Sequence, residues 1–116
     1  MTDREMLEWA AKAAGLTLAD PEDSYIPSGG LWIVGAGGRD LVWDPLHDDA
    51  AALRLAVILR FDLITHTRHG MTYAGTQNRS SCSYVDHDED PYAATRRAIV
   101  LAAAVIGQAI PPDKTT

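Results

Sequence analysis

The sequence holds very little cysteine and no long apolar run. Cys82 is the single cysteine among 116 residues, so the chain can form neither an internal disulfide nor a thiolate zinc cage, as expected in a reducing compartment. No stretch reaches the ~18 apolar residues of a membrane-spanning helix. Residues 1–5 carry charges where a secretory signal needs apolar residues. We therefore expect a cytoplasmic protein without membrane contact.

Basic residues are fewer than acidic ones. There are 10 lysines and arginines against 16 aspartates and glutamates, a formal net charge of −6, which makes nucleic acid a poor candidate partner. A hydrophobic share of 47% against 22% charged residues indicates a folded chain. Its length fits one domain over residues 1–116, with a frayed tail at 111–116. A local basic patch stays possible from Arg54, Arg60, Arg68, Arg96 and Arg97.

Capping residues and helical periodicity predict three helices, over about residues 3–14, 50–60 and 92–106. Thr2 and Glu5 have the spacing of a capping box, and Asp90 is followed by a proline that suits a first helical turn. Residues 50–60 are apolar on nearly all sides, which predicts that this helix is largely buried.

Runs rich in β-prone residues lie between the predicted helices. Residues 31–34 and 41–43 flank a glycine-rich segment and predict a hairpin. A phosphate-binding loop needs a helix directly after its glycines, but a second strand follows here, which favours a hairpin turn. Trp32 and Trp43 are expected in the core. Two or three further strands are expected between residues 61 and 85. The predicted fold class is α+β, a three-layer α-β-α sandwich with three helices around a mainly antiparallel sheet of about four to five strands.

Three stretches of the sequence together resemble a known family. They are residues 1–5 and 13–15 (MTDRE, AAG), residues 43–57 (WDPL, DD and ALRLAV within them) and residues 90–100 (DPYAATRRAIV). Over about half its length the chain resembles the phage ABA sandwich domain family. The resemblance implies a small phage or prophage protein with an α-β-α fold, and it brings no established activity, cofactor or catalytic residues.

Arginines on the second and third predicted helices allow two interpretations. Arg96 falls on the apolar stripe of its helix, which predicts either a structural ion pair or a side chain that reaches along the apolar surface to solvent. The functional alternative is that Arg96 binds an anionic ligand or the carboxylates of a partner together with Tyr92 and Arg97. Arg54 on the second helix allows the same alternatives. The acidic residues Asp86, Asp88 and Glu89 are solvated or capping groups, or a negative patch that imitates nucleic acid towards a host protein.

Metal-ligand residue types occur in three small groups, but the sequence shows no convergence of three or four ligands. Cys82 has no base beside it and the nearby serines lack an elbow motif, so no catalytic residue, metal or cofactor is predicted. The three groups are His47 with Asp48 and Asp49, His66 with His69, and His87 with Asp88 and Asp90.

These observations predict a non-enzymatic, phage-encoded accessory protein that acts in the host cytoplasm by binding a host protein, such as an antiviral-defence component. The expected surface comprises the loop after the first helix, the hairpin turn at residues 35–38 and residues 76–89. An alternative is a binder that sequesters an anionic nucleotide signal through Arg54, Arg96 and Arg97. An uncharacterised enzyme is the third candidate, and a chain of this size is also compatible with a homodimer.

Overall fold

The computed structural model describes residues 1–65 and 70–111. All three predicted helices are present, with ends within three residues of the expected ones. The elements, in chain order, are α1 (Asp3–Ala13), β1 (Leu31–Val34), the short 3-10 helix η1 (Ala36–Gly38), β2 (Asp40–Trp43), α2 (Asp49–Ile58), β3 (Asp62–Ile64), β4 (Met71–Gly75), β5 (Cys82–Asp86) and α3 (Pro91–Ala109).

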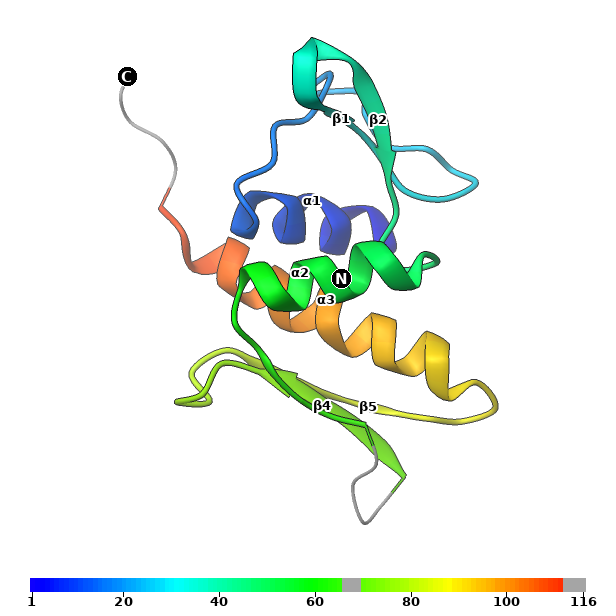
Figure 1. Ribbon diagram of the computed structural model, residues 1–116, viewed down its shortest axis with the longest axis vertical. Helices are drawn as coiled ribbons and strands as arrows, with labels where there is room; N and C mark the ends of the chain where they lie inside the picture. The colour runs from blue at the N-terminus through cyan, green and yellow to red at the C-terminus, as the bar shows by residue number, and fades with distance from the viewer. Residues whose placement is uncertain (66–69, 112–116) are drawn as a thin grey trace.

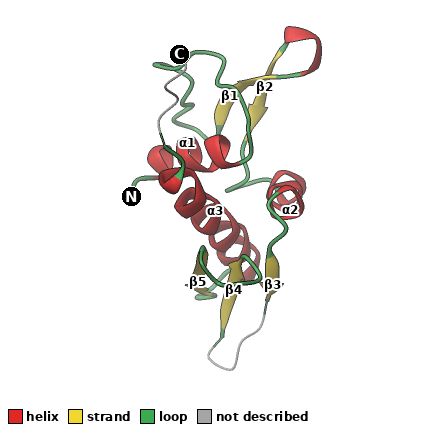
Figure 2. Cartoon of the chain, turned by 90° about the vertical axis from the view of Figure 1, so that its left-hand side faces the viewer, coloured by secondary structure: helices red, strands yellow, loops and turns green. Residues whose placement is uncertain are grey.

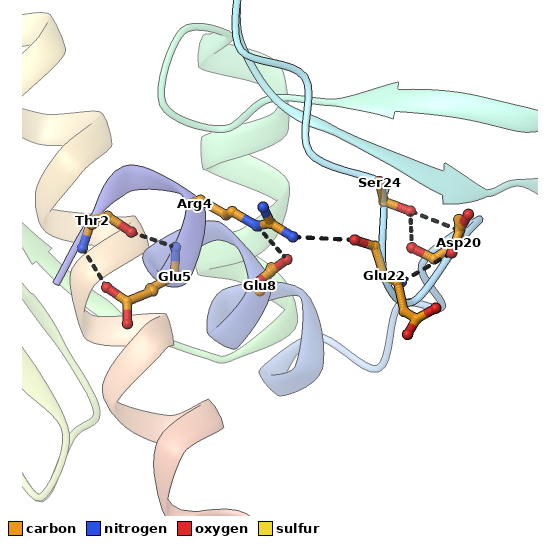
Figure 3. Close-up of polar contacts among 7 residues, drawn as sticks. All are labelled: Thr2, Arg4, Glu5, Glu8, Asp20, Glu22 and Ser24. Atoms are coloured by element: carbon orange, nitrogen blue, oxygen red, sulfur yellow. Dashed lines mark hydrogen bonds and ion pairs between the residues drawn. The ribbon is translucent and has the colours of Figure 1, made fainter.

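Side chains cap the helix N-termini as the sequence indicates. The Thr2 hydroxyl accepts a hydrogen bond from the Glu5 amide at 3.1 Å, and the Glu5 carboxylate accepts one from the Thr2 amide at 2.9 Å, which completes the capping box (Figure 3). The interactions of the carboxylate with Thr2, chiefly the hydrogen bond from the Thr2 backbone amide, hold the pKa of the Glu5 carboxyl below its ordinary value. Asp48 and Asp90 cap α2 and α3 in the same way.

The described strands form two separate antiparallel sheets. One is the β1–β2 hairpin, in which Trp32 lies opposite Val42, and the other has the order β3-β4-β5. The free edge of β1 is covered by the loop after α1, where the Val34 amide donates to the Thr17 carbonyl at 2.9 Å.

The helices form the middle layer between the two sheets (Figures 1 and 2). In both views the hairpin and the β3-β4-β5 sheet lie at opposite ends of the molecule, and α3 contacts α1, α2, β4 and β5. The α+β class with three helices and antiparallel strands is confirmed. A single four- to five-stranded sheet with helices on both faces is not confirmed, because the strands are divided between two sheets.

Small residues let α1 and α3 approach closely. Alanines of α3 pack with Met6 and Leu7 of α1 in the core, and a Cβ atom at Gly107 would overlap the carbonyl oxygen of Trp9. This contact is the reason why glycine is needed inside α3 despite its low helix propensity. Among the described residues, no helix combines the length and apolar character needed to cross a bilayer.

Two predictions of burial were wrong. Only the inner face of α2 is buried, against α3, and within residues 1–65 and 70–111 no second layer covers the other face; its outward Val57 is 68% exposed. Trp32 is 43% exposed on the outer face of the hairpin, whereas Trp43 packs against the core. Of the frayed tail predicted at residues 111–116, residues 112–116 lie outside the described residues.

Candidate functional site

A group of exposed apolar side chains gathers where α2, β3 and the start of α3 meet. Leu53 and Val57, one turn apart on α2, are 59% and 68% exposed, and Tyr92 on α3 is 73% exposed. Contiguous exposed apolar groups of this kind mark interaction sites more often than scattered single ones do. We define the α2–β3 surface by Leu53, Val57, Leu63 and Tyr92.

This surface borders a hollow of about 440 Å³ between α2, β3 and α3. Leu63 lies opposite Ala74 in the sheet, and Ala74 is fully buried, so the register turns Leu63 towards the helices. Leu53, Tyr92 and Ile99 supply other apolar walls. A hollow of this size with apolar walls and few polar groups is the usual form of a binding site.

Arg96 closes one side of the hollow and is already paired. Its Nε donates to the Leu46 carbonyl at 2.9 Å, and its Nη1 donates to Asp49 Oδ1 at 2.7 Å. The Arg96 side chain is only 16% exposed, so its charge is committed to joining the start of α2 to α3. This contact is the ion pair expected if Arg96 has a structural role and does not bind a ligand.

A series of hydrogen bonds links the hollow to His87, just after β5. The Thr95 hydroxyl, which lines the hollow, lies 2.9 Å from the Thr72 hydroxyl, and this hydroxyl lies 2.8 Å from His87 Nε2. Thr72 is fully buried, so both partners are needed to satisfy its hydroxyl. These hydrogen bonds hold α3 against β4, and Thr95 is a polar group in an apolar wall of the hollow.

The predicted binding residues separate into different places. Tyr92 and Arg96 line the hollow beside α2, whereas Arg54 lies on the exposed side of α2 and lines none of the described hollows with them. Arg97 Nη1 donates to Asp3 Oδ1 at 3.2 Å. A second hollow, of about 560 Å³, brings Arg97 together with Asp86, Asp88 and Glu89. The three arginines thus do not converge on one anion site.

The metal-ligand types do not converge either. Among residues 1–65 and 70–111, no three histidine, cysteine, aspartate or glutamate side chains are placed to share a metal ion. His47 Nδ1 lies 3.0 Å from Asp44 Oδ2, a local contact across three positions. His66 and His69 lie outside the described residues.

Sequence reasoning missed most of the α2–β3 surface, because an all-round apolar helix was interpreted as a buried one. The available signal was the chain length: a small domain has too little protein to cover both faces of each of three helices. An apolar helix in such a chain equally predicts an exposed binding face.

Comparisons with known proteins return nothing for this chain. No protein-family model, no curated protein and no solved structure matches it. The resemblance to the phage ABA sandwich domain family accordingly stays a prediction.

Proposed function

We propose that this chain is a non-enzymatic binding protein that docks a partner protein on its α2–β3 surface. The observation that carries the proposal is the exposed apolar face of α2, continued by Leu63 and Tyr92 around a hollow of about 440 Å³. Burying such side chains against a partner is the main favourable term in protein association. Tyrosine is also among the residues that most often dominate binding energies.

The partner in this proposal is a host protein, such as a component of an antiviral defence system. That identity, with the phage origin and the action in the host cytoplasm, rests on the family resemblance. The geometry supports the mode of binding: apolar side chains of the partner enter the hollow, and Thr95 and Asp49 provide polar contacts at its wall and rim.

The geometry gives less support to the alternative of sequestering an anionic nucleotide. Such a ligand needs convergent positive charge, but Asp49 neutralises Arg96, and Arg97 lies in a different hollow among acidic residues. The lining of the hollow beside α2 is mostly apolar.

Capture from a bacterial lysate with matched variants tests the proposal. The immobilised chain is compared with Val57→Asp and Tyr92→Ala, which change exposed residues and should leave the fold intact. Val105→Asp and Tyr84→Ala make equivalent changes at exposed residues outside both this surface and the β1–β2 hairpin. Far-UV circular dichroism checks that every variant is folded.

We expect a discrete partner to be retained by the wild type and both controls and lost by Val57→Asp and Tyr92→Ala. Equal retention by all five chains would show that binding does not involve the α2–β3 surface. A thermal shift with a nucleotide, sensitive to Arg96→Met, would instead favour the sequestering function.

A further inference from the structure

The outer face of the β1–β2 hairpin is a second exposed surface, at the end of the molecule opposite the β3-β4-β5 sheet (Figures 1 and 2). Trp32 lies opposite Val42 in the ladder, and the next pair on the same face, two residues along β1, is Val34 with Asp40. Because paired residues share a face, these four side chains lie together. Trp32 is 43%, Val34 41% and Val42 54% exposed.

The loop after α1 is fastened beside Trp32 by hydrogen bonds to its backbone. The Ala19 amide donates to the Trp32 carbonyl at 2.9 Å, and the Trp32 amide donates to the Ser24 carbonyl at 2.8 Å. Inside the loop, the buried Ser24 hydroxyl accepts from the Asp20 amide at 2.7 Å and donates to the Asp20 carbonyl at 2.6 Å (Figure 3). Arg4 donates to the Glu22 carbonyl at 3.3 Å and ties the same loop to α1.

This arrangement places carboxylates around the exposed indole. A shallow hollow of about 230 Å³ is lined by Asp20, Asp23 and Asp40 together with Trp32. Within residues 1–65 and 70–111, none of these three carboxylates has a lysine, arginine or histidine at ion-pair distance. The face therefore presents negative charge without compensation next to an aromatic ring.

We propose that this hairpin face binds a basic segment of a partner protein, with an arginine side chain seated on Trp32. A guanidinium stacks on an indole and donates to carboxylates in a fixed fork, so it matches both features of the hollow. Val34 and Val42 extend the face beyond the hollow, which suits a peptide rather than a small isolated cation. The site is separate from the α2–β3 surface and does not depend on it.

A labelled peptide of alternating glycine and arginine tests the proposal by fluorescence anisotropy with the full chain. The same peptide with citrulline in place of arginine removes the charge but keeps the shape. The chain is compared with Trp32→Ala and with Asp20→Asn/Asp23→Asn, in which the amide oxygen at position 20 can still accept from the Glu22 amide. Asp86→Asn/Asp88→Asn removes the same charge elsewhere, and Tyr92→Ala removes an exposed aromatic ring elsewhere.

We expect the arginine peptide to bind and the citrulline peptide to fail. Trp32→Ala should weaken binding about fivefold or more, as loss of a cation–π contact of about 1 kcal/mol predicts. Asp20→Asn/Asp23→Asn should weaken it by a similar or larger factor, and high salt should weaken it further.

Three results would overturn the proposal. The first is no binding of the arginine peptide by the wild-type chain. The second is an equal loss in Asp86→Asn/Asp88→Asn, which would show unspecific attraction to net negative charge. The third is binding of tetramethylammonium but not of the peptide, which would assign the hollow to a small cation.

Discussion

Replacing Gly107 by alanine tests the packing that holds the helical layer together. An ideal Cβ at this position would overlap the Trp9 carbonyl oxygen and lie 2.7 Å from the Trp9 carbonyl carbon. The clash is with backbone, so no side-chain rotation relieves it, and α1 has to move away from α3. The residues that lose contact are then the buried ones of α1, Met6, Leu7, Ala10 and Ala11.

Two opposing contributions set the change in the free energy of unfolding of Gly107→Ala. Overpacking a close-packed interface costs up to about 3 kcal/mol, whereas alanine in place of glycine inside a helix contributes about 1 kcal/mol of stability. The free energy of unfolding should therefore fall by about 2 kcal/mol. For a chain of this size that corresponds to a loss of roughly 10 °C in Tm.

Urea unfolding followed by circular dichroism measures this change. Gln108→Ala, at the exposed neighbouring position, serves as the control, because it changes helix propensity by a few tenths of a kcal/mol at most and leaves the buried contact between α1 and α3 unchanged. A Gly107→Ala chain as stable as the wild type, or more stable, would show that α1 and α3 do not approach as closely as described.

Three further predictions concern single side chains. Burial raises the pKa of the Tyr73 phenol, so the folded state favours the neutral form and the stability of the protein falls as pH rises above about 10. The variant Tyr73→Phe should therefore lose less unfolding free energy than the wild type between about pH 9 and 11. Arg96→Met should cost about 1–2 kcal/mol by urea unfolding, because the buried Leu46 carbonyl loses its donor, whereas Arg54→Met should cost under about 0.5 kcal/mol. Ser24→Ala should cost about 1 kcal/mol and speed amide exchange at residues 20–24, since the Asp20 amide loses its acceptor; unchanged exchange would contradict the role assigned to Ser24.

Local sequence signals predicted the helices well. Thr2 and Asp90 cap the helices that begin after them, because an N-cap depends on residues only two or three positions away. The hairpin at β1 and β2 was predicted for the same reason, since its glycine-rich turn lies between the two strands.

The layer order could not be predicted in the same way. Alternating apolar residues show that a strand has a buried face, but they do not show which strands pair or which layer covers that face. The loop after α1 takes the edge of β1 through backbone groups at Thr17, Ala19 and Ser24, and backbone groups leave no mark in the sequence. The exposure of α2 and Trp32 follows from that separation of the sheets.

The sequence identified candidate binding residues, but it did not show how they are arranged in space. Arg96 and Tyr92 do lie in one hollow, and the acidic residues Asp86, Asp88 and Glu89 do share another. The partners Leu46 and Asp49 of Arg96 lie 50 and 47 positions away along the chain, so no local pattern could reveal them.

Site-specific photocrosslinking tests the binding role of α2 most directly. A photoreactive phenylalanine analogue is placed at position 57 or, as a control, at position 105, and each chain is irradiated in a lysate of a bacterial host. The α2–β3 surface predicts a discrete adduct with another protein from position 57 and none from position 105. Adducts of the same pattern from both positions, no adduct from position 57, or an adduct only with a second copy of the chain would contradict it.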